Sequence, residues 1–200
     1  FIFPQWSLCP PWWIFINKEE IIKFVKYVQP LFGAINIEDI ESPKVLEIVE
    51  RLKKEISIPV FHDDQHGTAI ITLAALINSL KLVRKQLEKI KVLILGAGSA
   101  GYGINKILTS AGCKNTIVVD SKGAIYEGRN DLINNKFKSE IASQSNPTKI
   151  DGSLDSVIDG AAVRHGYATP YVMTMFALVP IPIAPFIIRQ YGWAHLWQEF

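Results

Sequence analysis

The length, composition and charge of the chain exclude several classes of protein. Two hundred residues suffice for one hydrophobic core and part of a second domain. A formal net charge of +2 is too small to indicate a nucleic-acid partner. The two cysteines, Cys9 and Cys113, form neither a disulfide framework nor a metal motif, so we expect a cytoplasmic protein.

The charged middle of the chain begins with helices and short strands in alternation. Lys18–Val28 alternates charged and apolar residues at helical spacing, and Pro43–Glu55 repeats that pattern. Between them, Phe32–Ile40 is predicted as a short buried strand that runs into Glu38 and Asp39. The two acids could meet one ion at the end of this strand, but a surface turn explains the pair equally well.

A second acidic pair, Asp63 and Asp64, lies where a predicted strand gives way to a helix. The apolar residues of Ile56–Val60 predict a buried strand before the pair, and Thr68–Leu82 predicts a helix after it. Because that helix is apolar nearly all round, we expect it to be buried. Adjacent carboxylates repel each other, so a divalent metal or a buried lysine should neutralise them. One aspartate alone would more simply cap the helix.

A glycine-rich turn is the clearest binding motif of the chain. It follows the β-rich run Lys91–Leu95, and an apolar-periodic helix follows it over Gly101–Ser110. In this setting the glycines bring a pyrophosphate close to the backbone at a helix N-terminus. Asp120 closes the next strand, Cys113–Val119, at ~20 residues beyond the glycines, where a carboxylate binds the adenosine ribose. The alternative is a turn that packs a helix without a ligand. The motif residues are Gly96, Ala97, Gly98, Ser99, Ala100 and Gly101.

The acid that closes this second strand favours NAD as the cofactor, but neighbouring Lys122 leaves NADP open. Ser121–Arg129 is predicted as a loop, Asp131–Gln144 as a polar helix, and one more helix begins near Ser153. Tyr171–Ile188 is an uncharged run of 18 residues that would nearly cross a bilayer as a helix, although its prolines argue against a regular span. Membrane contact through this run stays an alternative.

The middle of the chain, about residues 18–162, resembles the bacterial and archaeal type of malic enzyme. Four pieces carry the likeness: Phe32–Ile40, Pro59–Ala69, Gly96–Gly101 and Asp120–Arg129. The second (Pro-Val-Phe-His-Asp-Asp-Gln-His-Gly-Thr-Ala) and the fourth (Asp-Ser-Lys-Gly-Ala-Ile-Tyr-Glu-Gly-Arg) are long and specific. The resemblance implies an α/β fold, with a partial Rossmann-type doubly wound parallel sheet preceded by the metal-binding part of a malic-enzyme-like domain.

This resemblance also divides the chain into parts. Residues 18–89 would form the metal-site segment, and residues 90–162 would form a truncated NAD(P)-binding half. The flanking regions, residues 1–17 and 163–200, are apolar tails to which we assign no role.

The resemblance further implies a reaction and the residues that serve it. In the family three carboxylates hold Mg²⁺ or Mn²⁺, and they correspond here to Glu38, Asp39 and Asp64, while Asp63 would act beside the ion, turned toward a catalytic lysine. The implied reaction is oxidative decarboxylation of (S)-malate: hydride passes from C2 to NAD or NADP, the metal polarises the ketone, and loss of CO₂ leads to pyruvate. We also expect a homo-oligomer.

Some groups of the family are not matched in this sequence. The family's catalytic tyrosine and lysine, and an arginine that grips malate, lie upstream of the metal pair; Lys18, Lys23 and Tyr27 do not fit their motifs. We therefore expect the chain alone to be weak or inactive. Two other functions stay open: a non-catalytic NAD-binding or interaction module, and an amino-acid dehydrogenase-like nucleotide domain, which would leave the acidic residues unused.

Overall fold

The computed structural model describes residues 17–153 and 157, and the fold reported below concerns these residues. The two predicted tails, with the uncharged run at 171–188, lie outside them except for Asn17. Among the helices of the described part, none combines the length and the apolar character that a bilayer crossing requires.

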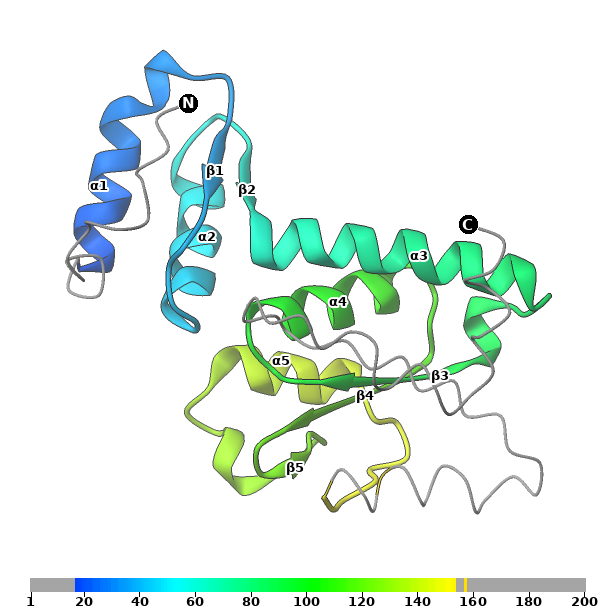
Figure 1. Ribbon diagram of the computed structural model, residues 1–200. Helices are drawn as coiled ribbons and strands as arrows, with labels where there is room; N and C mark the ends of the chain where they lie inside the picture. The colour runs from blue at the N-terminus through cyan, green and yellow to red at the C-terminus, as the bar shows by residue number, and fades with distance from the viewer. Residues whose placement is uncertain (1–16, 154–156, 158–200) are drawn as a thin grey trace, which may run out of the picture.

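The first half of the fold sets two helices against a two-stranded parallel sheet (Figure 1). Helices α1 (Lys18–Val28) and α2 (Lys44–Glu55) confirm the predicted amphipathic helices, and a short 3₁₀ turn, η2 (Gln29–Leu31), follows α1. Strand β1 (Ile35–Ile37) pairs in parallel with β2 (Val60–His62).

Charged side chains hold α1 to α2, while apolar side chains fill the space between them. The Asn17 side chain accepts a hydrogen bond from the backbone of Glu19, which caps α1. Ile22 and Val25 of α1 are buried in the same apolar cluster as the inner face of α2. Three ion pairs cross from α1 to α2: Lys18 with Glu47, Glu19 with Arg51, and Lys26 with Glu55.

A continuous helical segment joins the two halves of the fold. Strand β2 passes into a single π-helical turn, η3 (Asp63–Gly67), which continues as α3 (Thr68–Leu82). The bounds of α3 are those predicted, and α3 lies along α4 (Ser99–Ser110) in Figure 1. A Cβ atom at Gly103 of α4 would lie 2.2 Å from the backbone oxygen of Gln65, so α4 and η3 are in close contact.

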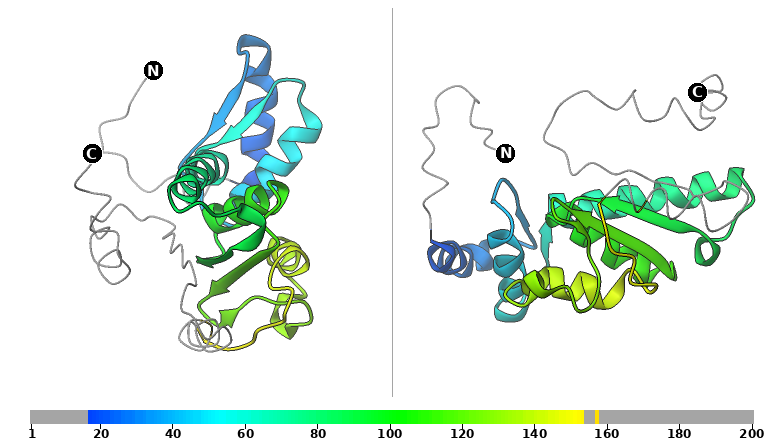
Figure 2. Two further views of the ribbon diagram at one scale, coloured as in Figure 1. Left: turned by 90° about the vertical axis from the view of Figure 1, so that its right-hand side faces the viewer. Right: turned by 90° about the horizontal axis from the view of Figure 1, so that it is seen from below.

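The second half is a Rossmann-like unit. Strands β3 (Lys91–Leu95) and β4 (Asn115–Asp120) are parallel and joined through α4, and β5 (Gly123–Ala124) pairs antiparallel with β4. Helix α5 (Lys136–Gln144) packs against α4, and two 3₁₀ turns, η4 (Leu87–Lys89) and η5 (Asn130–Leu132), complete the described elements. The two further views in Figure 2 show this sheet beside α4 and α5 and apart from the β1–β2 sheet.

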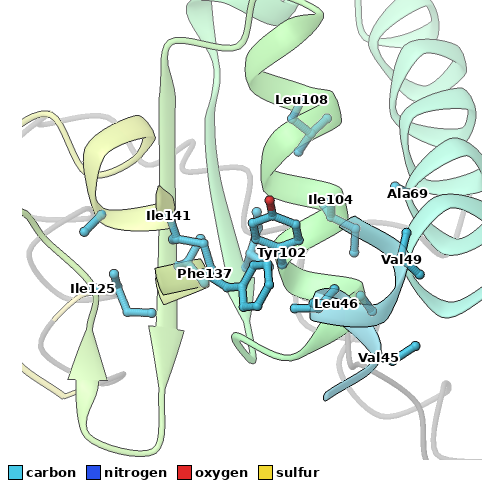
Figure 3. Packing of buried hydrophobic residues seen from close by; sticks show 14 of the residues in the cluster. Val45, Leu46, Val49, Ala69, Tyr102, Ile104, Leu108, Ile125, Phe137 and Ile141 are labelled. Carbon is cyan, nitrogen blue, oxygen red and sulfur yellow. The ribbon is translucent and has the colours of Figure 1, made fainter. Parts of the chain in front are cut away.

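One apolar core joins the two halves. In Figure 3, Leu46 and Val49 of α2 face Ile104 and Tyr102 of α4. The Tyr102 ring meets the Phe137 ring of α5 edge-on, with centroids 5.4 Å apart. Helices α2, α4 and α5 all contribute to this cluster, so both halves of the fold pack on the same apolar core.

Several predicted strand boundaries were wrong. The strand predicted over Ile56–Val60 lies instead at Val60–His62, because Ile56 still closes α2 and Pro59 has no N–H for a ladder. The strand within Phe32–Ile40 is only three residues long. The predicted loop Ser121–Arg129 contains β5, whose pairing with β4 is a tertiary contact that local sequence does not reveal.

The predicted helices also needed adjustment. Helix α4 begins at Ser99 rather than Gly101, and the predicted helix over Asp131–Gln144 begins only at Lys136, where Asn135 caps it. The helix predicted to begin near Ser153 lies mostly outside the described residues, and of it the structure gives one hydrogen bond, from the Val157 N–H to the Ser153 carbonyl over 3.0 Å.

The expectation that α3 is buried all round was also wrong. Ala69, Thr72, Leu76 and Leu80 are buried, but the opposite side of the helix is exposed.

Candidate functional site: a dinucleotide pocket and an acidic edge

The glycine-rich turn has the backbone that the sequence predicts for a phosphate-binding loop. It follows β3 directly, and α4 begins at Ser99, so the N–H groups of the first turn of α4 open beside it. The Gly96 N–H donates to the carbonyl of Val119 over 2.8 Å, which ties the turn to the end of β4. The turn therefore lies where the two parallel strands end.

Two glycines of this turn have different steric roles. A Cβ atom at Gly101 would lie 1.9 Å from the backbone oxygen of Gly96, so no larger residue fits there without displacing the turn. A Cβ atom at Gly98 would meet no atom within 4 Å. Gly101 thus allows the helix to approach the strand, and Gly98 leaves a space beside the backbone that a ligand can enter.

A pocket of about 570 Å³ adjoins the turn. The turn contributes Gly96, Ala97 and Gly98, the ends of β3 and β4 contribute Leu95 and Asp120, and α5 contributes Lys138. The predicted residues Ser99, Ala100 and Gly101 are buried at the start of α4 and do not line the pocket. The remaining lining residues are Ser42, Pro43, Leu46, Val119, Ser121, Asn135 and Phe137.

Asp120 is the acidic residue that lines this pocket. Its side chain is only 5% exposed, and its Oδ2 accepts hydrogen bonds of 2.6 Å from both Arg129 and Lys138. Its Oδ1 accepts from the backbone N–H of Lys122 at 2.9 Å and again from Arg129 at 3.1 Å. Four donors fill the acceptor capacity of one carboxylate.

This environment keeps Asp120 ionised. Burial opposes its charge, but the hydrogen bonds from Arg129 and Lys138 outweigh burial and hold the pKa of Asp120 well below its usual range. The sequence suggested that Lys122 could hold the 2′-phosphate of NADP. In the structure its side chain forms an ion pair with Asp131 at 3.1 Å. Any further hydrogen-bond donor to Asp120 would have to replace one of its present donors, and Lys138 is the more exposed of the two side chains that pair with Asp120.

Sequence reasoning missed the roles of Arg129 and Lys138. Arg129 is the last residue of one of the segments that carry the family resemblance. The sequence did not show that its side chain pairs with Asp120. Lys138 lies 18 residues beyond Asp120 on a separate helix, and no motif pointed to it.

The second candidate region, the acidic edge, consists of Glu38 and Asp39 after β1 and Asp63 and Asp64 at the start of η3. Ile37 pairs with His62 in the parallel ladder, so the two acidic pairs follow neighbouring strand ends. All four acids are exposed. The Asn36 side chain donates to Glu38 Oε1 over 2.7 Å, and Gly67 leaves room for the carboxylate of Asp63.

The described structure does not gather the three predicted metal ligands into one group. Within residues 17–153 and 157, no three His, Cys, Asp or Glu side chains lie close enough together to hold a metal ion. Glu38, Asp39 and Asp64 therefore share one edge of the fold without converging on one point. Their oxygen donors are chemically suited to Mg²⁺ or Mn²⁺.

Two histidines flank the second acidic pair. His62 is fully buried, neither of its ring nitrogens has a hydrogen-bond partner, and its Nε2 lies 3.8 Å from Asp64 Oδ2. His66 Nδ1 accepts from the His62 backbone N–H at 2.9 Å. Burial, reinforced by nearby cations such as Lys53, lowers the pKa of His66 to about 4, and burial lowers that of His62 as well. Neither histidine thus supplies the positive charge that the carboxylates lack.

Comparison with known proteins gives one consistent family. The family model described as "Malic enzyme, NAD binding domain" matches residues 65–164, which is half of the chain. The chain belongs to the malic enzyme family. It is 50% identical over 157 residues to the NAD-dependent malic enzyme of Geobacillus stearothermophilus, an alignment that covers 78% of this chain and 32% of that protein. It is 36% identical over 176 residues to the NADP-dependent malic enzyme of Escherichia coli, covering 86% of this chain and 22% of that protein.

Solved malic enzyme structures agree with this assignment. The crystal structure of the NAD-dependent malic enzyme of Thermotoga maritima matches with a TM-score of 0.68 and 45% identity, covering 73% of this chain and 39% of that one. The predicted Rossmann-like fold and the malic enzyme resemblance are thereby confirmed. The chain spans a third or less of the length of the two curated relatives named above.

Proposed function

We propose that this chain supplies the cofactor- and metal-binding part of a malic enzyme that converts (S)-malate to pyruvate and CO₂ with NAD. The observation that carries the proposal is the open side of Gly98, which faces a pocket at the N-terminus of α4 with Asp120 at its far strand end. The 50% identity to an NAD-dependent malic enzyme supports the choice of reaction. Residues 18–89 would then hold the metal ligands, and residues 90–162 would bind the cofactor.

In this proposal the dinucleotide lies along the pocket. Its pyrophosphate would lie over Gly96, Ala97 and Gly98 beside the first N–H groups of α4, and its adenosine ribose would reach Asp120. Lys138 would then turn from Asp120 toward solvent or toward the ligand. Arg129 pairs with both Asp120 and Asp131, so Lys138 is the cation that would meet a 2′-phosphate, and NADP stays the second cofactor to test.

The acidic edge would take the divalent cation and the substrate. Glu38, Asp39 and Asp64 would hold Mg²⁺ or Mn²⁺, and Asp63 would lie beside them. A divalent cation supplies charge stabilisation to the developing ketone and enolate, and NAD supplies the hydride acceptor. The Asp64 carboxylate lies 3.8 Å from Nε2 of buried His62, which has no hydrogen-bond partner within the described residues. If Asp64 turned toward the interior of the fold, it would accept a hydrogen bond from this Nε2. The exposed, separated carboxylates support a site that assembles only when its ligands arrive.

The test is a pair of measurements on residues 1–200. Isothermal titration should detect NAD binding, and malate should strengthen it only when Mn²⁺ is present. The absorbance of reduced nicotinamide should rise slowly or not at all, because the family's acid–base groups are not matched in this sequence. Rapid turnover would contradict that expectation.

A non-catalytic NAD-binding module is the second candidate. The separation of Glu38, Asp39 and Asp64 favours it, because an unassembled metal site cannot by itself promote decarboxylation. The titration separates the two functions: NAD binding that Mn²⁺ and malate leave unchanged would establish the module and contradict the enzyme. The predicted homo-oligomer stays a prediction, which light scattering of the same sample measures.

A further inference from the structure

An amino group and an imidazole ring meet where helix α2 approaches the π-helical turn η3. Lys53, near the C-terminal end of α2, places its Nζ atom 2.9 Å from Nε2 of His66, which belongs to η3. In Figure 1, α2 lies beside β2, the strand that leads into η3. Lys53 belongs neither to the lining of the dinucleotide pocket nor to the acidic edge, so the function proposed above does not use it.

The hydrogen bonds of the His66 ring determine which form of Lys53 fits this contact. The backbone N–H of His62 donates to Nδ1 of His66 over 2.9 Å, so Nδ1 carries no proton. A neutral imidazole has one proton on its two nitrogens, and here that proton must be on Nε2. Nε2 therefore donates, and Nζ of Lys53 has to accept. An ammonium group has three donors and no acceptor, so only the neutral amine of Lys53 completes this contact.

The surroundings of Lys53 also favour the neutral amine. In the part of the chain that the structure describes, no carboxylate forms an ion pair with Lys53, whereas its neighbour Lys54 pairs with Glu50 at 2.9 Å. Desolvation and the cation of Lys106, on the facing helix α4, lower the pKa of Lys53 below its ordinary value. Lys106 is itself paired with Glu140 at 3.0 Å, which favours its protonated form.

A lysine amine that is neutral and accessible is a nucleophile. At about pH 7.4 roughly one ordinary lysine in a thousand has lost its proton, since the ordinary pKa is about 10.4. Lys53 is exposed, so a small electrophile can reach it. We propose that Lys53 is a nucleophilic lysine and a site of covalent modification by activated acyl groups, the class that acyl phosphates and acyl thioesters share. This inference goes beyond the proposed function and does not depend on it.

The modification is an acyl transfer. When Nζ leaves its contact with Nε2 of His66, its lone pair attacks the acyl carbon and forms an amide C–N bond. The bond from that carbon to the phosphate oxygen or the thiolate sulfur breaks, the leaving group takes the electron pair, and one proton passes from Nζ to water. An amide nitrogen does not accept hydrogen bonds, so α2 would lose this link to the turn that carries Asp63 and Asp64.

Competitive acetylation of two neighbouring lysines tests the proposal. The 200-residue chain is treated at about pH 7.4 with acetyl phosphate in one experiment and with acetyl-coenzyme A in the other. Initial rates at individual lysines are measured by fragmentation mass spectrometry. Lys54 is the matched control, because it follows Lys53 directly, is 71% exposed and has an acidic partner. The same rates are measured in a denaturing concentration of urea.

The expected result is a selectivity that depends on the fold. Lys53 should be acetylated at least ~10-fold faster than Lys54 in the folded chain by one or both donors, and the donor that reacts identifies the source of the acyl group. In urea the ratio should fall to about one, because His66 and Lys106 no longer lie beside Lys53. Equal rates in the folded chain with both donors would overturn the proposal. A ratio that urea leaves unchanged would also overturn it, because the reactivity would then come from local sequence.

Two variants test the causes separately. Lys106→Gln removes the neighbouring cation, and His66→Phe removes the Nε2–H donor. Each should slow the acetylation of Lys53 by about threefold or more and leave the rate at Lys54 unchanged. Circular dichroism shows whether each variant folds, and an unchanged rate at Lys53 in both folded variants would overturn the proposal. The comparison of Lys53 with Lys54 needs no substitution, so it decides the proposal even where a variant does not fold.

Discussion

The two candidate regions of this chain differ in how completely they are formed. At the dinucleotide pocket, Asp120 is 5% exposed and surrounded by four donors, and the Gly96–Gly101 turn is tied to the end of β4. At the acidic edge, the Asp64 side chain is 64% exposed and shares no metal-binding group with Glu38 and Asp39. The pocket is held together by hydrogen bonds within its own segment, whereas the acidic edge consists of exposed carboxylates that do not converge.

This difference follows from where the partners of each region come from. The glycine turn, Asp120 and Arg129 belong to one short stretch of chain that folds on itself through β3, α4 and β4. The acidic residues follow two three-residue strands, and within residues 17–153 and 157 no lysine or arginine forms an ion pair with Glu38, Asp39, Asp63 or Asp64. A pocket for a large cofactor can therefore be complete while the site of chemistry is not.

The largest effect is expected from Gly101→Val. The side chain would enter the space of the Gly96 carbonyl, 1.9 Å from the Cβ position, so the chain should lose about 3 kcal/mol or more of stability together with NAD binding. Urea unfolding and NAD titration measure both losses. The control is Gly98→Ala, which has open space and an extended backbone, and which should keep stability within ~0.5 kcal/mol while weakening NAD binding. Equal behaviour of the two variants would contradict the distinction between the glycines.

The next effect is expected from Asp120→Asn. Loss of this charge removes one of the two carboxylates that pair with the Arg129 guanidinium, which is 10% exposed and keeps its ion pair with Asp131, and should cost about 2 kcal/mol in urea unfolding at pH 7. The exposed Asp64→Asn variant is its counterpart at the acidic edge and should change stability by less than about 0.5 kcal/mol. Comparable losses in both variants would show that the two regions are equally organised.

The same variant gives a pH dependence with a definite sign. The pKa of Asp120 is lower in the folded chain than the ordinary value of 3.8, so its ionised form stabilises the fold above that value and the contribution is lost as pH falls further. The stability difference between the wild-type chain and Asp120→Asn should be constant from pH 7 to about pH 5 and shrink below about pH 4. Urea midpoints across this range test it, and a difference that grows toward low pH would be inconsistent with the ion pair.

A smaller effect is expected from Lys138→Gln. This change removes the more exposed cation beside Asp120 and should lower NADP affinity relative to NAD by about fivefold, since a charge-assisted hydrogen bond is lost. Lys122→Gln is the control, because Lys122 pairs with Asp131 and its side chain is 67% exposed. Fluorescence titration with reduced NAD and reduced NADP measures both affinities in each variant. If Lys138→Gln leaves the ratio of the NADP and NAD affinities unchanged, Lys138 does not bind the 2′-phosphate.

The smallest change in stability and the most selective change in function are expected at the acidic edge. Asp64→Asn should fold and bind NAD as the wild-type chain does, but Mn²⁺ should no longer strengthen malate binding, because an amide oxygen is a weaker ligand than a carboxylate. Calorimetric titration of malate with and without Mn²⁺ measures this. A retained Mn²⁺ effect would remove Asp64 from the proposed ligand set.

Much of the fold was predictable because it depends on local pattern. The apolar spacing located α2 to within one residue, and both α1 and α3 have the predicted bounds. The turn between β3 and α4 was predicted because each glycine serves a backbone requirement within six residues of chain. Such features follow from sequence alone because neighbouring residues satisfy them.

What the tertiary structure decided involves partners distant in sequence. Asp120 forms ion pairs with Arg129 and Lys138, which lie 9 and 18 residues further along the chain. No local sequence pattern predicts these pairs. The apolar composition of α3 predicted burial, yet only packing determines which side meets α4 and which side remains open. The sequence by itself determined the identity of the elements and of the acidic residues, because these depend on side-chain chemistry and periodicity. Only the fold decided which charges are paired and which surfaces are covered, because both depend on distances through space.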